Sequence, residues 1–372
     1  KDIEHYINEL GQFYVQLCKM GINIKVIDTG GGLAVDYEGS RTRSFNSTNY
    51  TLSEYALTLL SKIKSLCDKN YLPLPQIFTE SGRATTAHHA VFVSNIVEVE
   101  SIVGEEVPDI GKIKDEDLLE LDDMLDSFNK LPINEIYSST VLAIESVHNR
   151  FAAGELTLEK RALAEQLFSH IKLEIMKRLN PLHRSHRDLF DILDEDLAKK
   201  IIVNFSLFQS IPDSWAISQL FPVMPLSHLD EEPTMRSIIE DITCDSDGKI
   251  NNYMDYQGNE PSLKLPKYNP ENPYLLGIFL VGAYQEIMGN MHNLFGKVTT
   301  LDICLDGKGN FEFENIHDGF TNKDSLEHVG YDIIEMQDLF RKSLISLKLP
   351  KAEQIKLMNQ IKDIFDSHTY LT

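Results

Sequence analysis

Cysteine, tryptophan and long apolar runs are scarce in this chain of 372 residues. Its 4 cysteines are widely spaced and form no CxxC pair, so the sequence predicts neither a structural zinc site nor a disulfide framework. The longest apolar run, Tyr274 to Tyr284, is shorter than the ~20 residues that a membrane-spanning helix needs. We therefore expect a cytoplasmic protein that does not enter a membrane.

Basic residues are few beside acidic ones, with 35 Lys and Arg against 57 Asp and Glu and a formal net charge of −22. This balance argues against a nucleic-acid-binding or anionic-membrane surface and favours the attraction of cations. Hydrophobic residues make up 42% and charged residues 25%, which is typical of a folded globular protein. The length exceeds the ~100–200 residues of one ordinary domain, so we expect several structural units.

The first part of the chain, residues 1–105, alternates helical and strand patterns. It opens at Lys1 on a helical pattern without an initiator methionine, and we expect it to be part of a longer protein. Two short apolar strands, Ile24 to Asp28 and Gln76 to Glu80, are each followed by polar residues. This pattern is typical of a parallel α/β barrel, and two strands form only part of one.

Three further parts are expected from changes in pattern along the chain. Residues 106–200 have helical periodicity and predict a helical-bundle insertion. Residues 201–322 contain short β-rich runs, beginning with Ile201 to Phe208, and predict a β-sandwich or small barrel. Residues 323–372 predict two amphipathic helices divided at Leu349-Pro350. The expected fold class is therefore α/β plus β, with added helices.

Two candidate anion or cofactor segments directly follow the predicted strands. Gly30, Gly31 and Gly32 can present backbone N–H groups to a phosphate, although a simple tight turn explains them equally well. Glu80 could hold a pyridine nitrogen protonated while Arg83 supplies charge near a phosphate. The alternative for Glu80 and Arg83 is a surface ion pair.

Two more candidate segments lie in the β-rich part. Cys244 and Asp245 could provide a proton donor and an anionic anchor for a cationic substrate, although a lone cysteine is more often a small buried hydrophobe. Gly248 is wrongly spaced for a calcium loop of the EF-hand type. Tyr284, after Gly282-Ala283, could reach a phosphate with its hydroxyl or could be a core tyrosine with a solvated tip.

The order of these segments resembles the fold-type III pyridoxal-phosphate-dependent decarboxylases that act on ornithine, arginine and diaminopimelate. Several stretches are similar to the C-terminal portion of the biosynthetic arginine decarboxylases in particular: Val26–Tyr37, Glu80–His89, Pro212–Pro225, Cys244–Gly248 and Leu276–Phe295. The resemblance implies a partial pyridoxal-phosphate-binding (β/α)8 barrel followed by the β-rich domain.

The resemblance also assigns expected roles to individual residues. The residues on the phosphate side are Gly30, Gly31, Gly32, Gly82, Arg83 and Tyr284. Glu80 would pair with the pyridine nitrogen, Cys244 would handle the proton at the reacting carbon, and Asp245 would face the distal cation of the substrate. The further residues expected on the substrate side are Asp28, Leu33, Asp36 and Tyr37.

The activity that the resemblance implies is α-decarboxylation of L-arginine to agmatine, in polyamine biosynthesis, with pyridoxal 5'-phosphate and Mg²⁺. It further implies a homodimer or homotetramer with shared active sites. The family's Schiff-base lysine has no matching motif in this chain, so we expect the chain alone to be inactive. The alternatives are decarboxylation of ornithine, diaminopimelate or carboxynorspermidine, and a non-catalytic regulatory fragment of the same fold.

Overall fold

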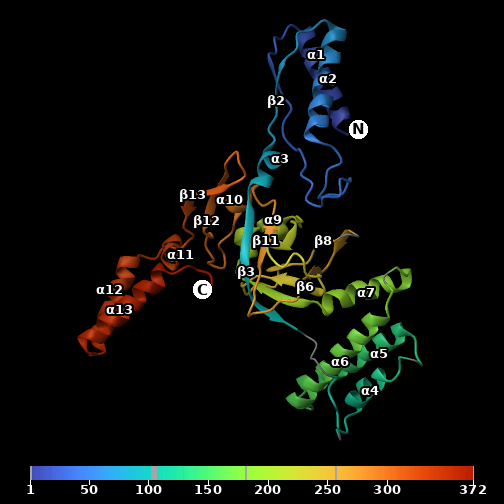
Figure 1. Ribbon diagram of the computed structural model, residues 1–372, viewed down its shortest axis with the longest axis vertical. Helices are drawn as coiled ribbons and strands as arrows, with labels where there is room; N and C mark the ends of the chain where they lie inside the picture. The colour runs from blue at the N-terminus through green and yellow to red at the C-terminus, as the bar shows by residue number, and fades with distance from the viewer. Residues whose placement is uncertain are drawn as a thin grey trace. The chain divides into compact units, whose positions relative to one another are not determined.

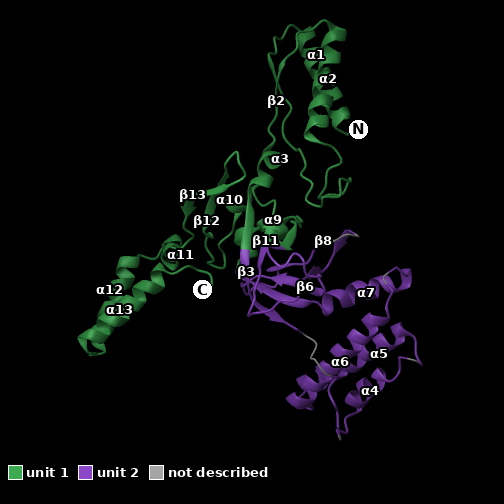
Figure 2. Cartoon of the chain, in the orientation of Figure 1, with its two compact units in different colours: residues 1–93, 205–224, 277–372 green, residues 94–204, 225–276 purple. Residues whose placement is uncertain are grey.

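The structure is a computed structural model that describes residues 2–101, 107–111, 113–128, 130–180, 182–255 and 258–371. The chain divides into two compact units that alternate along the sequence (Figure 2). Unit 1 comprises residues 1–93, 205–224 and 277–372, and unit 2 comprises residues 94–204 and 225–276. Lys1 and the expected boundary at residues 105 and 106 lie outside the described residues, and the division into four parts stays a prediction.

The beginning of unit 1 alternates helix and strand (Figure 1). Its elements are α1 (Asp2–Lys19), β1 (Val26–Asp28), α2 (Leu52–Asn70) and β2 (Gln76–Phe78). Strands β1 and β2 pair in parallel, as the alternation predicted. Ile27 of β1 is buried with Ile7 and Tyr14 of α1 and with Ile63 of α2, so both helices pack on the same core as the strand.

The start of α2 follows directly from its sequence. Thr51 caps the helix, because its hydroxyl accepts from the Glu54 amide while the Glu54 carboxylate accepts from the Thr51 amide. The first turn of α2 therefore begins where the chain leaves the long loop after β1, and this loop contains the three glycines.

Unit 2 contains the expected helical bundle. Its helices are α4 (Glu116–Leu125), α5 (Ile133–Ala152), α6 (Leu158–Arg178) and α7 (Arg184–Asp196). The apolar stripes of these helices meet in one core, in which Leu121, Ile136 and Ile171 are fully buried. Buried Asp115 accepts hydrogen bonds from Arg150 of α5 and Lys160 of α6, and so ties the start of α4 to both helices.

The β-rich part is a mixed sheet in the order β10-β6-β4-β3-β11-β5, with β7 paired to β6. The bounds are β3 (Val91–Glu100), β4 (Lys199–Val203), β5 (Val223–Pro225), β6 (Met235–Glu240), β7 (Lys249–Ile250), β10 (Leu263–Leu265) and β11 (Leu275–Phe279). Strands β8 (Tyr253–Asp255) and β9 (Gly258–Glu260) form a further antiparallel pair. Strands β4 and β6 run parallel, whereas β3 and β4 run antiparallel.

Short helices lie between some of these strands along the chain. They are α3 (Gly82–Thr86), the 3-10 turn η1 (Ala87–His89), α8 (Leu207–Ser210), α9 (Pro212–Ala216) and α10 (Gln285–Met288). The strand expected over Ile201 to Phe208 is shorter than predicted, because the Ser206 hydroxyl accepts from the Gln209 amide and begins α8 at Leu207. The last elements are the hairpin β12 (Thr300–Leu305) and β13 (Phe311–His317), then α11 (Asn322–His328), α12 (Ile333–Ser346) and α13 (Lys351–Asp366).

The break between the last two helices falls where the sequence predicted it. Helix α12 ends at Ser346, and Pro350 precedes the first residue of α13, where proline's missing N–H costs no helical hydrogen bond.

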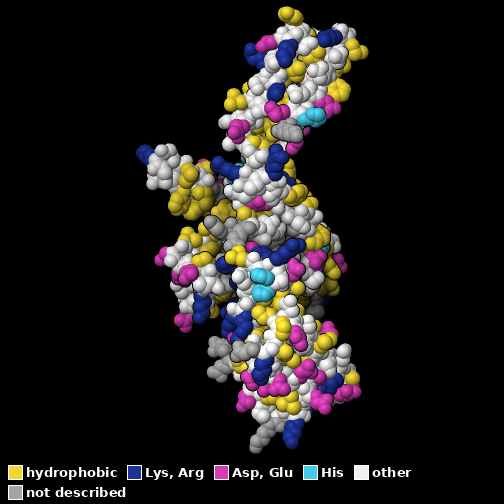
Figure 3. All heavy atoms as spheres, turned by 90° about the vertical axis from the view of Figure 1, so that its right-hand side faces the viewer, with side chains coloured by type: hydrophobic (Ala, Val, Ile, Leu, Met, Phe, Trp, Pro, Cys, Tyr) yellow, Lys and Arg dark blue, Asp and Glu magenta, His cyan; other side chains and the backbone are white. Residues whose placement is uncertain are grey.

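The surface mixes charges of both signs. On the face that Figure 3 shows, acidic side chains are interspersed with basic and apolar ones. Within the described part of the chain, the helices are all too short or too polar to cross a membrane.

Candidate active site

The glycine loop after β1 is joined to the segment after β2 by backbone contacts. The Glu80 amide donates to the Gly30 carbonyl at 2.8 Å, and the Thr29 amide donates to the Phe78 carbonyl at 2.9 Å. A Cβ on Gly31 would lie 2.5 Å from the Glu80 carbonyl oxygen, closer than real Cβ atoms approach. The close approach therefore requires glycine at position 31 and brings the first two candidate segments together.

The two flanking glycines adopt left-handed backbone conformations. Gly30 has φ +66° and Gly32 has φ +84°, a region that glycine enters without steric cost. The space beside both is open. Asp28, which was expected on the substrate side, accepts a hydrogen bond from the Gly30 amide at 2.8 Å. The loop is therefore shaped by its own residues and leaves room for a ligand beside the backbone.

Tyr284 lies against the second segment from a distant part of the sequence. A Cβ on Gly82 would lie 2.5 Å from the Tyr284 hydroxyl, so the phenol packs directly against the glycine. Tyr284 has φ +71° and precedes α10. The next residue, buried Gln285, donates to the Asp213 carboxylate at 2.8 Å and accepts from the Asp213 amide at 3.1 Å. This reciprocal pair fixes the turn that carries Tyr284.

Arg83 is held between two tyrosine rings. Its guanidinium carbon lies 5.9 Å from the centre of the Tyr37 ring and 5.7 Å from that of Tyr284. It donates to the Gln219 side-chain oxygen at 2.6 Å. Burial raises the pKa of Tyr37, and the neighbouring Arg83 acts in the opposite direction. The Tyr37 phenol is therefore neutral at physiological pH.

These residues line a cavity of about 320 Å³ in unit 1. The lining residues that were predicted from the sequence are Gly32, Leu33, Tyr37, Glu80, Gly82, Arg83 and Tyr284. The volume lies at the lower end of the ~300–1,000 Å³ that small-molecule sites occupy. The structure thus brings together most of the residues predicted on the phosphate side, along with Glu80.

Pyridoxal phosphate fits the chemistry of this cavity. The glycine loop has open space beside Gly30 and Gly32, and Arg83 and Tyr284 supply a cation and a hydroxyl for an anionic group. Glu80 supplies a carboxylate for a basic ring nitrogen. The donor set therefore suits a ligand that combines a phosphate with a pyridine ring.

Cys244 and Asp245 belong to unit 2, in the loop between β6 and β7. The Cys244 thiol is free and its residue is exposed. The Asp245 carboxylate accepts from the Asp247 amide at 3.1 Å, and the Asp245 carbonyl accepts from the Gly248 amide at 3.0 Å. Their chemical roles stay predictions.

Asp36 is used inside its own loop. Its carboxylate accepts from the Ser47 hydroxyl at 2.8 Å and from the Arg41 amide at 3.1 Å. Leu33 is buried and lines the cavity. The expected contacts of Asp28, Leu33, Asp36 and Tyr37 with a substrate likewise stay predictions.

Several residues of the cavity were not predicted from the sequence. Phe45, Ile217 and Gln219 also line the cavity. The Gln219 side-chain nitrogen donates to the Asn46 side-chain oxygen. These residues carry no motif of their own. The resemblance over Pro212–Pro225 indicated that this segment belongs to the site, but it did not single out the Gln219 side chain.

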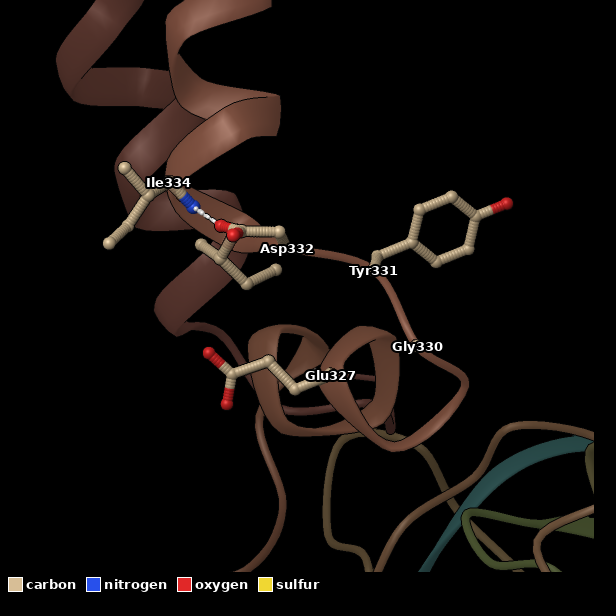
Figure 4. Close-up of a pocket in the computed structure, with 6 residues that line it drawn as sticks. Glu327, Gly330, Tyr331, Asp332 and Ile334 are labelled. Atoms are coloured by element: carbon tan, nitrogen blue, oxygen red, sulfur yellow. Dashed lines mark hydrogen bonds between the residues drawn. The ribbon is translucent and has the colours of Figure 1, made fainter.

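A second hollow, of about 460 Å³, lies where α11 meets α12 (Figure 4). The Asp332 carboxylate in its wall accepts from the Ile334 amide at 2.8 Å and so caps α12. The hollow contains none of the predicted site residues. Across the residues that the structure describes, no group of three or more His, Cys, Asp or Glu side chains is placed to hold a metal ion.

Two segments of the chain match models of known protein families. The model of the pyridoxal-dependent decarboxylase pyridoxal-binding domain matches residues 1–87, which include the glycine loop and the segment from Glu80 to Arg83. The model of the arginine decarboxylase helical bundle domain matches residues 114–194. The candidate site therefore lies in a segment that is similar to the pyridoxal-binding domain of the pyridoxal-dependent decarboxylases.

Individual relatives narrow this class. The chain is 43% identical to the biosynthetic arginine decarboxylases of Pasteurella multocida (strain Pm70) and of Yersinia pestis, with all of this chain and 58% and 57% of theirs covered. It matches the crystal structure of the biosynthetic arginine decarboxylase from Campylobacter jejuni with a TM-score of 0.81 and 34% identity, covering 100% of this chain and 60% of that one. The chain is thus homologous to the biosynthetic arginine decarboxylases and spans less than two thirds of their length. The predicted resemblance to these enzymes and the predicted fold class are confirmed.

Proposed function

We propose that this chain is part of a pyridoxal-phosphate-dependent enzyme that decarboxylates L-arginine to agmatine and CO2. The observation that carries the proposal is the cavity in which Glu80, Arg83 and Tyr284 meet at the glycine loop. The names of the relatives support arginine as the substrate. The acidic composition fits a cationic substrate and a cytoplasmic enzyme.

Each residue of the cavity has a distinct task in this proposal. When bound, pyridoxal phosphate supplies an electron sink for the pair left by departing CO2. Gly31 and Gly32 present backbone amides to the phosphate, while Gly30, whose amide donates to Asp28, shapes the turn. Arg83 and Tyr284 add a charge and a hydroxyl. The Glu80 carboxylate holds the proton on the ring nitrogen, which keeps the ring able to accept electrons.

Cys244 and Asp245 complete the proposed chemistry. Cys244 delivers the proton to the reacting carbon, and the Asp245 carboxylate binds the guanidinium of arginine. We further propose a homodimer or homotetramer in which this loop serves a neighbouring subunit's site, with Mg²⁺ as an additional cofactor. The cavity lining contains no lysine among its described residues, so we expect no turnover by this chain alone.

Glu80→Gln in the longer protein tests the proposal. The amide keeps the shape of Glu80 but cannot stabilise a protonated ring nitrogen. We expect the decarboxylation rate to fall about 100-fold or more, because ring protonation acts in the chemical step. We expect cofactor affinity, measured by absorbance titration of the apo protein, to change less than about threefold.

Glu9→Gln on α1 is the control, because it removes the same charge from an exposed residue that does not line the cavity. Near-normal turnover in Glu80→Gln would remove Glu80 from this role. Failure of the unmodified protein to release CO2 from arginine would refute the proposed reaction.

A further inference from the structure

Arg83 has a neutral hydrogen-bond partner where a carboxylate would be the ordinary choice. Its guanidinium donates to the Gln219 side-chain oxygen at 2.6 Å and lies over the rings of Tyr37 and Tyr284. Within the part of the chain that the structure describes, no carboxylate lies within ion-pair distance of Arg83. Arg83 is thus fixed in place while its positive charge is not neutralised by a paired acid.

Gln219 is itself fixed by further buried contacts. Its side-chain nitrogen donates to the Asn46 side-chain oxygen at 2.9 Å and to the Leu220 carbonyl at 2.9 Å. Gln219 is 5% exposed and Asn46 6% exposed. Both donors of the amide nitrogen are satisfied, so the amide oxygen must point at Arg83. The orientation of the glutamine is therefore determined by its surroundings.

The alternative residue at this position would change the charge but little else. A glutamate has almost the same shape and would accept from Arg83 more strongly. It would also neutralise the guanidinium beside a cavity that already contains the Glu80 carboxylate. An anion entering that cavity would then meet net negative charge, which weakens its binding.

We propose that Gln219 is a positioning residue that holds Arg83 as an uncompensated cation for the phosphate of pyridoxal phosphate. The inference rests on the proposed function, because it takes the cavity as the cofactor site. It adds that a neutral amide at position 219 is needed for selective binding of the phosphorylated cofactor.

The experiment compares two ligands on the apo form of the longer protein. Dissociation constants for pyridoxal phosphate and for pyridoxal, which lacks the phosphate, are measured by absorbance titration in the unmodified protein and in Gln219→Glu. We expect Gln219→Glu to weaken pyridoxal phosphate about 10- to 100-fold, the range of one charge-assisted contact. We expect the affinity for pyridoxal to change less than about threefold.

Three further variants sharpen the test. Gln16→Glu adds the same charge on the exposed surface of α1 and should leave both affinities unchanged. Arg83→Gln should lose the same phosphate selectivity, and adding Gln219→Glu to it should have little further effect, because the two act through one charge. Should Gln219→Glu fail to fold, Gln219→Met removes the acceptor and should still weaken pyridoxal phosphate severalfold more than pyridoxal.

The outcomes separate the inference from the proposed function. Unchanged affinity for pyridoxal phosphate in Gln219→Glu, with selectivity lost in Arg83→Gln, would overturn the inference and leave the cofactor site intact. Equal weakening of both ligands would also overturn it, as would unchanged selectivity in a folded Gln219→Met. Absence of pyridoxal phosphate binding by the unmodified protein would overturn the proposed function itself.

Discussion

The loops that follow β2 and β6 both contain a predicted motif, but they are stabilised in different ways. The segment from Glu80 to Arg83 is held by Gly31, Tyr284 and Gln219, which are distant in sequence. The loop of residues 241–248 is largely held from within. Asp241, at its start, accepts from the Thr243 amide at 2.9 Å and hydroxyl at 2.8 Å, and the Asp241 amide donates to the Gly248 carbonyl at 2.7 Å.

This comparison separates two routes to a functional loop. The first loop depends on the folding of unit 1, because its contacts form only when residues far apart in the sequence meet. The second loop depends mainly on its own residues. Changes around the first should affect stability and cofactor binding together, whereas changes in the second should remain local.

The largest expected effect is that of Gly31→Ala. The added methyl group would collide with the Glu80 carbonyl, and this backbone atom cannot move without separating the ends of β1 and β2. We expect the protein to lose about 3 kcal/mol of unfolding free energy. Urea denaturation followed by circular dichroism measures this loss.

Gly21→Ala is the matched control for Gly31→Ala. Gly21 has φ +86° but open space around its Cβ position, so alanine brings backbone strain without a collision. We expect a loss of about 1 kcal/mol. Equal losses in the two variants would show that the approach of the two loops adds nothing to stability.

The next largest effect is expected for substitutions of Cys244 and Asp245 in the second loop. In the longer protein, the two substitutions should change different kinetic parameters. Asp245→Ala should raise KM for arginine about 30-fold, since a charge-assisted contact contributes about 2 kcal/mol. Cys244→Ala should chiefly lower kcat, because the proton donor acts in the chemical step. Steady-state decarboxylation assays separate these two effects.

Mixing two inactive variants tests whether the active site is shared between subunits. An inactive Cys244→Ala protein and an inactive lysine-site variant should regain activity together, because a mixed dimer contains one site with both groups intact. Lack of rescue despite demonstrated subunit exchange would contradict the shared site. Similar losses of stability in both loop variants, without kinetic differences, would indicate a purely structural turn.

The smallest effect on the free energy of unfolding is expected for a substitution of Asp241. Asp241→Ala removes the acceptor of two hydrogen bonds and should cost about 1 kcal/mol. Hydrogen exchange measured by mass spectrometry should accelerate only in the peptides that cover residues 241–248. Asp241→Asn keeps one carbonyl oxygen and should behave nearly as the unmodified protein, and accelerated exchange across unit 2 would contradict the local character of the loop.

Periodicity predicted the elements whose burial follows a regular pattern. The stripe with Leu59 and Ile63 identified α2, and the stripe with Leu167, Ile171 and Ile175 identified α6. Periodicity predicted a strand from Ile201 that was too long. Ser206 begins a helix there, and this cap depends on one hydrogen bond that periodicity does not reveal. The long strand β3 was not predicted as a separate element.

The sequence by itself determined the order of the motifs and the chemistry of their side chains. Gly30, Gly31, Gly32, Glu80 and Arg83 could be named because they follow predicted strands in an order that resembles the pyridoxal-phosphate-dependent decarboxylases. Only the tertiary structure decided that Tyr284 lies on Gly82 and that Gln219, supported by Asn46, orients Arg83. The physical reason is that hydrogen bonds between residues more than a hundred positions apart leave no periodic trace in the sequence, since they depend on which segments the folded core brings together.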